Sequence, residues 1–193
     1  MREAEKLKYS GKFKERFSDM KLPNAEDIIA TVPKNRVLVI DAKEVGDPHA
    51  FTQKIEKLRL KYGLNREQLI FITSPSHSLI LNKEYPGYKS ILSATVSAAN
   101  GEFTNSAEDI VKTCKENGFH AVMIGHWEAD KIALIPNGFI KFIKDNGIKV
   151  CIWTENATEN LEKWKALGVD FICTDKGTKF LESANREHSP REK

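Results

Sequence analysis

The sequence predicts an α/β fold built around a parallel sheet, and three observations carry that prediction. Short runs such as residues 69–72 and 121–124 are apolar throughout, as in strands buried on both faces. Helical patterns alternate with these runs along the chain. A glycine ends several helical patterns just before the next apolar run, where glycine suits a helix C-cap. This repeated unit is typical of a barrel or of a doubly wound sheet, covered on both sides.

The first half of the chain predicts three helices and three strands. Asn24 suits a helix N-cap, and Glu26 and Asp27 favour the first turn. A lysine-rich segment with helical periodicity ends at Gly63, which suits a C-cap. The expected order is helix 25–31, strand 37–40, helix 50–62, strand 69–72, helix 77–82 and strand 90–96.

The second half repeats the alternation three more times. Ser106 suits an N-cap, and Gly118, Gly147 and Gly168 each follow a helical pattern. The expected order is helix 107–117, strand 121–124, helix 138–146, strand 150–153, helix 158–167 and strand 171–173. About six strands result. No glycine-rich phosphate loop is visible, so a nucleotide-binding Rossmann fold has little support.

Length and composition favour one soluble domain. The 193 residues are 40% hydrophobic and 30% charged, which is an ordinary balance with enough chain for a real core. We expect a polar leader over residues 1–21, a domain over 22–181 and a disordered tail over 182–193. No run approaches the about 18 apolar residues of a membrane span, and no signal peptide is recognisable.

Charge and cysteine usage narrow the setting. The net charge of +3 equals the excess of Lys and Arg over acids in residues 1–21, where acids interrupt the basic residues. We interpret that leader as a solvated segment rather than a phosphate- or lipid-binding arm, and expect no nucleic-acid partner. Cys151 and Cys173 lie in apolar runs and suit small core side chains. No cysteine pair has zinc or redox spacing, so a reducing, cytoplasmic location fits best.

Polar residues follow several of the predicted strands. Trp153, Thr154 and Asn156 come at the end of one strand, and Thr174 and Asp175 follow the next. Ligands of parallel α/β folds are met at the carboxyl ends of the strands. We therefore expect these side chains to line one rim of the sheet.

The same two segments carry a resemblance to a known family. Residues 147–156 read Gly-Ile-Lys-Val-Cys-Ile-Trp-Thr-Glu-Asn, and residues 167–175 read Leu-Gly-Val-Asp-Phe-Ile-Cys-Thr-Asp. They resemble the last two strands of the glycerophosphodiester phosphodiesterase barrel, roughly G-x-x-V-x-x-W-T-V-N and G-V-D-G-I-I-T-D. Residues 37–43 are similar to its L-x-I-E-I-K, and the likeness extends from about Ser10 to Leu181. It implies a TIM-barrel-like (β/α) fold.

The family's opening motifs are not found in this sequence. They read H-R-G, I-E-x-D-V and V-V-x-H-D, and they supply two histidines and two metal-binding carboxylates. The resemblance therefore implies an incomplete barrel that lacks its first strands, with no catalytic residue assigned. Because open sheet edges expose unpaired backbone groups, we expect a homodimer or a partner chain to cover them.

The resemblance also implies a reaction and a set of site residues. Family members hydrolyse a glycerophosphodiester to glycerol phosphate and an alcohol, in lipid metabolism, with a divalent cation such as Mg²⁺ or Ca²⁺. A lysophospholipid-type substrate is also implied. Asp41 takes the place of a metal-binding Glu, and Lys43 that of a phosphate-contacting Lys. Trp153 would form an apolar wall beside the glycerol. The alternatives are a helix-capping Asp41, a solvated Lys43 and a core-packed Trp153.

Three interpretations of the whole chain remain open. It is a phosphodiesterase whose catalytic start lies elsewhere, and which is inactive alone; a pseudoenzyme or headgroup-binding module that keeps the rim; or an unrelated α/β enzyme. His126, Trp127 and Glu128 could form an acid–base group, but the resemblance places no catalytic histidine there. A Ser74–His77 nucleophile pair lacks the strained elbow that such a serine needs.

Overall fold

The computed structural model describes residues 23–95, 105–125, 138–178 and 182. Within them, six strands form one sheet in chain order, from β1 at one edge to β6 at the other. All five neighbouring pairs are parallel. The strands are Leu38–Ala42 (β1), Leu69–Thr73 (β2), Lys89–Thr95 (β3), Ala121–Gly125 (β4), Lys149–Trp153 (β5) and Phe171–Ile172 (β6). A doubly wound sheet reverses its strand order, so the barrel interpretation is confirmed over the doubly wound one.

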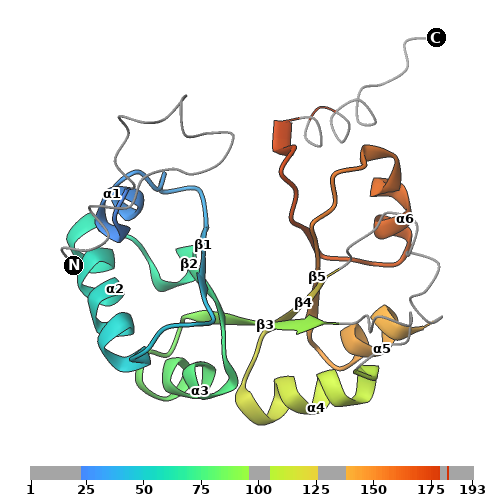
Figure 1. Ribbon diagram of the computed structural model, residues 1–193, viewed down its shortest axis with the longest axis horizontal. Coiled ribbons are helices and arrows are strands. Elements are labelled where there is room, and N and C mark those ends of the chain that lie inside the picture. Colours follow the sequence, from blue (N-terminus) through green and yellow to red (C-terminus); the bar gives the residue numbers. More distant parts are fainter. Residues whose placement is uncertain (1–22, 96–104, 126–137, 179–181, 183–193) are drawn as a thin grey trace.

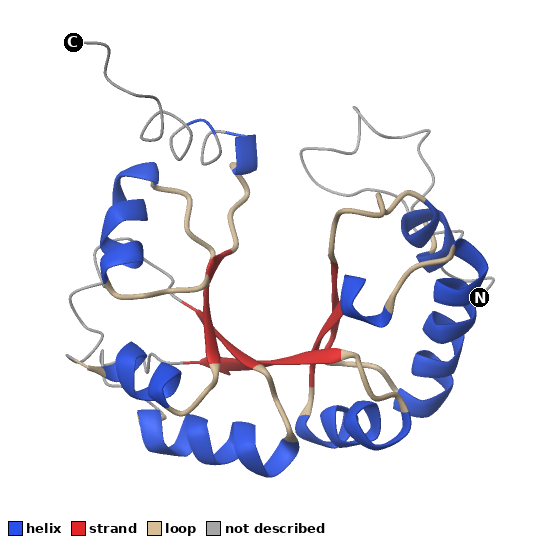
Figure 2. Ribbon diagram, turned by 180° about the vertical axis from the view of Figure 1, so that it is seen from behind, coloured by secondary structure: helices blue, strands red, loops and turns tan. Residues whose placement is uncertain are grey.

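The α-helices lie outside the curved sheet, and the strands line its inside (Figure 1). The arc of strands is open between β1 and β6 (Figure 2). Six strands are described, against the eight of a closed TIM barrel. The predicted incomplete (β/α) barrel is therefore confirmed. The helices are Ala25–Ala30 (α1), Pro48–Tyr62 (α2), Pro75–Glu84 (α3), Ala107–Asn117 (α4), Phe139–Asp145 (α5) and Leu161–Ala166 (α6).

Local capping explains where the helices begin and end. The Asn24 side chain accepts hydrogen bonds from the backbone of Glu26 and Asp27, at 2.8 and 3.1 Å, as predicted. Gly63 and Gly118 end α2 and α4 in the left-handed region, at φ 64° and 67°. The helix expected over residues 158–167 begins instead as a 3₁₀ turn, Thr158–Asn160, ahead of α6. The leader and residues 183–193 lie outside the described residues.

The outer face of the sheet is packed under the helices in two clusters. One joins β1 and β2 to α1–α3 around Phe71, Leu69 and Ile55. The other joins β3–β6 to α4–α6 around Ile124 and Trp164. Strand register sets this arrangement, because alternate residues of each strand point to opposite faces.

The inner face carries the other set of alternate side chains, and it is less covered. Ile72, Ile91 and Met123 pack there as a third, smaller cluster. Towards the two edges, Val39 and Phe171 are each 45% exposed. The sheet was expected to be covered on both sides, but in the described part of the chain the α-helices cover only the outer side. No described helix is both long and apolar enough to cross a membrane.

An ion cluster around Glu56 joins α2 to the start of β3. The Glu56 carboxylate pairs with Arg59 at 2.8 Å and with Arg66 at 2.7 Å. The Tyr88 hydroxyl also donates a hydrogen bond to Glu56. The hydrogen bond from Arg59 is the main cause that holds the pKa of Glu56 far below its ordinary value.

Candidate ligand-binding site at the carboxyl ends of the strands

The first part of the candidate site lies at the end of β1. Asp41 is paired in register with Ile72, a member of the inner-face cluster, so its side chain is on the inner face. Lys43 follows directly after the strand, and its Nζ lies 3.1 Å from Asp41 Oδ2. The backbone N–H of Lys43 also donates to Asp41 Oδ1, at 3.4 Å. A carboxylate and an ammonium group therefore form an ion pair at the end of β1.

The second part lies at the end of β5, where Trp153 packs against the inner-face cluster. Its register partner on β4 is Gly125. A Cβ at Gly125 would lie 3.2 Å from the Trp153 ring atoms Cε2 and Nε1, tighter than ordinary van der Waals contact. Glycine at this position therefore lets the indole lie close against the backbone of β4.

Curvature of the sheet brings these two strand ends together. Lys43 Nζ lies 5.5 Å from the centroid of the Trp153 ring, within the range of a cation–π contact. β1 and β5 are separated by three strands in the sheet, so only the curl of the half-barrel makes this contact. Asp41, Lys43 and Trp153 thus form one group at the carboxyl ends of the strands. We call this end of the half-barrel the carboxyl mouth. Their individual roles towards a ligand stay predictions.

The loops after β5 and β6 are joined by Asn156. Its side-chain oxygen accepts from the Asp175 backbone at 2.9 Å and from the Thr174 hydroxyl at 3.1 Å. Its side-chain nitrogen donates to Asp175 Oδ2 at 3.1 Å. Asn156 does not cap the 3₁₀ turn that follows, whose N-cap position is Ala157. Asn156 stabilises the rim as a link between neighbouring strand ends.

Sequence reasoning missed Glu155, which is the buried anchor of this rim. It is 1% exposed, and its carboxylate accepts from Trp164 Nε1 at 2.8 Å and from Asn160 Nδ2 at 3.1 Å. The backbone N–H of Ala157 donates to it at 2.7 Å. The available signal was an acid two residues after a largely buried strand, where a buried charge must be satisfied by donors.

The described residues at the carboxyl ends of the strands do not form a metal site by themselves. Among residues 23–95, 105–125, 138–178 and 182, no three His, Cys, Asp or Glu side chains gather closely enough to hold a metal ion. Asp41 is one carboxylate, and it is paired with Lys43. Mg²⁺ and Ca²⁺ need six or more oxygen ligands, from protein or water. The donor set described here therefore does not fit such an ion.

His77 and Ser74 are structural rather than catalytic. The His77 ring is 0% exposed, and its Nε2 lies 2.8 Å from the Thr52 hydroxyl. Burial lowers the pKa of His77 below its ordinary value. Ser74 caps α3 and accepts from the His77 backbone, not from its ring. The proposed acid–base group at residues 126–128 lies outside the described residues.

The cysteines differ from expectation at one position. Cys151 is buried, but Cys173 is exposed rather than part of the core. Both lie on the inner face, on adjacent strands or just after them. A hydrogen bond between the two thiols lowers the pKa of Cys173 to about 7. The thiols are far apart in sequence, so spacing alone could not pair them.

Comparisons with known proteins agree with this architecture. A crystal structure of a glycerophosphodiester phosphodiesterase from Parabacteroides distasonis is 20% identical with a TM-score of 0.68, covering 97% of this chain and 71% of that one. The Thermotoga maritima enzyme is 18% identical with a TM-score of 0.59, covering 88% and 67%. An Oleispira antarctica phosphodiesterase, solved with the product sn-glycerol-3-phosphate, is 14% identical with a TM-score of 0.59, covering 77% and 55%. These likenesses establish the fold.

Sequence comparison establishes the family. No curated protein sequence matched the chain. The sequence model of the Glycerophosphoryl diester phosphodiesterase family matches residues 2–179, which is most of the 193 residues. This match spans all six strands and the group formed by Asp41, Lys43 and Trp153. The chain belongs to the Glycerophosphoryl diester phosphodiesterase family.

Proposed function

We propose that this chain is the substrate-facing part of a glycerophosphodiester phosphodiesterase and binds a glycerol phosphate group at its carboxyl mouth. The contact between Lys43 and Trp153, at 5.5 Å, carries the proposal. An ammonium has three donors for phosphate oxygens, and an indole face offers an apolar wall to the glycerol carbons. The Oleispira antarctica relative binds sn-glycerol-3-phosphate, which supports this class of ligand.

The reaction proposed is hydrolysis of the diester to glycerol phosphate and an alcohol. The family is typically metal-dependent, and a bound divalent cation would neutralise phosphate charge. This chain's own residues would bind and orient the diester: Lys43 holds the phosphate and Trp153 shields one side from water. Among the described residues, the group formed by Asp41, Lys43 and Trp153 includes no acid–base histidine, so we propose that the chain does not turn over substrate alone.

Binding is tested by titrating sn-glycerol-3-phosphate into the full chain in a calorimeter. Lys43→Met keeps the apolar stem but removes the charge, and is expected to weaken binding about ten-fold or more, the size of a lost charge-assisted hydrogen bond. Trp153→Leu is expected to weaken it less. Lys83→Met, at an exposed position on α3, serves as the matched control. Wild-type affinity in Lys43→Met would contradict the proposed site.

Activity is tested separately with glycerophosphocholine as substrate. The purified chain with added Mg²⁺ or Ca²⁺ is expected to release no choline above the rate without protein. Metal-dependent turnover that Lys43→Met abolishes would refute the proposed inactivity while supporting the site.

A second candidate is a headgroup-binding module without catalysis. The observation that favours it is the donor set at the mouth, where the described residues gather no group fit for a metal. Fusing the opening motif block of the Parabacteroides distasonis enzyme to this chain separates the two candidates. Restored turnover favours the phosphodiesterase, and binding without turnover in a folded fusion favours the module.

The open edges lead to a proposal about assembly. β1 and β6 each lack a neighbour on one side within the described sheet, and such edges recruit strands. We propose that a second copy or a partner chain covers them. Size-exclusion chromatography with light scattering is expected to give concentration-dependent association, and a monomer at all concentrations would contradict it.

A further inference from the structure

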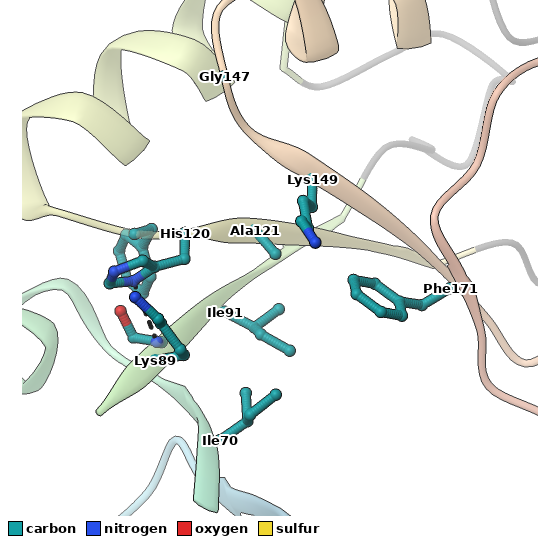
Figure 3. A pocket seen from close by; sticks show the side chains of 10 residues that line it. Ile70, Lys89, Ile91, His120, Ala121, Gly147, Lys149 and Phe171 are labelled. Atoms are coloured by element: carbon teal, nitrogen blue, oxygen red, sulfur yellow. Dashed lines mark hydrogen bonds between the residues drawn. The ribbon is translucent and has the colours of Figure 1, made fainter. Parts of the chain in front are cut away.

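A cavity lies at the amino-terminal ends of the strands, at the opposite end of the sheet from Asp41 and Trp153. Its volume is about 380 Å³, at the small end of the range for ligand pockets. Figure 3 shows its wall, which is formed by side chains from β2 to β6 and the turns that precede them. We refer to it as the basal pocket, lined chiefly by Ile70, Lys89, Ile91, His120, Lys149 and Phe171.

The floor of the basal pocket is apolar. Register pairs Ile70 with Lys89 and Ile91 with Ala121, so the two branched apolar side chains lie on the inner face, where they form the floor. Phe171 closes one side and is 45% exposed. An exposed apolar surface of this kind favours a ligand with an apolar body.

The rim of the basal pocket is cationic, and its described lining includes no counter-charge. Lys89 and Lys149 both line it, and no Asp or Glu is among its described lining residues. Neither lysine has a carboxylate partner in the part of the chain that the structure describes. Lys149 Nζ lies 5.5 Å from the Phe171 ring centroid, which holds the ammonium over the apolar side of the pocket.

His120 adds a neutral donor beside Lys89. The Ser90 backbone N–H donates to His120 Nδ1 at 3.4 Å, so the neutral ring carries its hydrogen on Nε2. Burial, and then the nearby Lys89, lower the pKa of His120. The ring therefore contributes a hydrogen-bond donor without adding a further charge to the rim.

We propose that the basal pocket binds an amphipathic monoanion: a carboxylate held by Lys89 and Lys149, with an apolar chain lying on Ile70, Ile91 and Phe171. Two ammonium groups without a carboxylate partner among the described residues, together with an apolar floor, favour a ligand that has both a charge and an apolar chain. A bare anion would leave the floor wet, and a neutral chain would leave the cations without a partner. A medium-chain fatty acid has both.

The test compares three probes on the full chain, under conditions where light scattering gives a single species. Decanoate carries charge and tail, decanol carries only the tail, and inorganic phosphate carries only charge. Calorimetry is expected to give at least about ten-fold tighter binding for decanoate than for either of the others. Equal affinity for phosphate, or for decanol, would overturn the proposal.

Variants place the ligand in the basal pocket. Lys149→Met is expected to weaken decanoate about ten-fold, whereas Lys112→Met, on the exposed side of α4, leaves it unchanged. Phe171→Glu puts a carboxylate beside Lys149 at an exposed position, and is expected to abolish binding while circular dichroism remains native. Unchanged decanoate affinity in both pocket variants would overturn the proposal.

The proposed site is independent of the glycerol phosphate site. Decanoate affinity is expected to be unchanged in Lys43→Met, because Lys43 follows the carboxyl end of β1. Loss of decanoate binding in Lys43→Met, with wild-type affinity in Lys149→Met, would place the fatty acid at the other end and refute the basal pocket.

Discussion

The two faces of the curved sheet differ in how far they are packed. On the outer face, Trp164, Ile124 and Phe71 are no more than 1% exposed beneath the α-helices. On the inner face, Val39 and Phe171 are nearly half exposed, although strand alternation gives both faces apolar side chains. This difference indicates that contacts between the helices and the sheet supply most of the packing in the half-barrel. The inner face is packed at its centre and exposed towards β1 and β6.

The first prediction, which has the largest expected effect, compares the loss of an aromatic side chain from the outer face with the same loss from the inner face. Trp164→Ala removes a fully buried indole from the outer cluster and is expected to lower the free energy of unfolding by about 3–5 kcal/mol. Phe171→Ala, the inner-face counterpart, is expected to cost less than about 1 kcal/mol because its ring is half exposed. Urea unfolding measures both. Similar costs would mean that the inner face is packed in solution.

The second prediction concerns the buried anchor after β5. Glu155→Gln keeps the shape of the side chain but removes the charge of the carboxylate, which accepts three hydrogen bonds. The substitution is expected to lower the free energy of unfolding by about 1–3 kcal/mol. Glu159→Gln, an exposed neighbour on the 3₁₀ turn, is expected to change stability by less than about 0.5 kcal/mol. Thermal unfolding followed by circular dichroism distinguishes them. Equal melting temperatures would contradict the anchoring role.

The third prediction tests the ion cluster around Glu56 by measuring stability as a function of pH. The pKa of Glu56 is lower in the folded protein than its ordinary value of 4.5, so its stabilisation is present above that value and is lost as pH falls through the folded pKa. Glu56→Gln is expected to cost about 1–3 kcal/mol at pH 7. The difference in the free energy of unfolding between Glu56→Gln and the wild type should become smaller below about pH 4.5. A gap that is constant from pH 7 to pH 3 would contradict this assignment.

The fourth prediction uses the cysteines, and its effect on stability is the smallest. Burial raises the pKa of Cys114, on the outer side, to about 12, whereas Cys173 on the inner side has a pKa of about 7. Alkylation of Cys173 by iodoacetamide, followed by peptide mass spectrometry, is expected to rise with a midpoint below the ordinary thiol value of 9.0. Cys114 should stay unmodified in the folded chain.

A matched variant sharpens the cysteine comparison. Cys151→Ala removes the donor to the Cys173 thiolate and should move the alkylation midpoint towards the ordinary value of 9.0. An unchanged midpoint in Cys151→Ala would rule out Cys151 as the cause.

Local sequence patterns predicted most of the fold. Six apolar runs became six strands, and helix α4 has the predicted bounds, because Ser106 and Gly118 cap it at both ends. The ends of the strands were predicted less accurately. β1 continues through Asp41 and Ala42, because its backbone pairing with β2 extends past the apolar run. Residue preferences depend on the side chains of one segment, whereas the length of a strand also depends on the strand beside it.

The candidate site was predictable only in its members. Strand ends and the family resemblance selected Asp41, Lys43 and Trp153, but their closeness depends on sheet curvature, which no local pattern records. Glu155 was missed because its partners, Asn160 and Trp164, become visible only when the chain turns back after β5. The Cys151–Cys173 pair has the same origin, in the register of β5 with β6.

Strand order has a further consequence for how the chain folds. Within the described sheet, each strand pairs only with its neighbours along the sequence, so every such pairing closes a loop of one helical crossover and has a modest entropic cost. A closed barrel must also join its first strand to its last, which is the most distant contact in the chain. The six described strands include no such pairing, so they can assemble one βα unit at a time, as a repeat protein does.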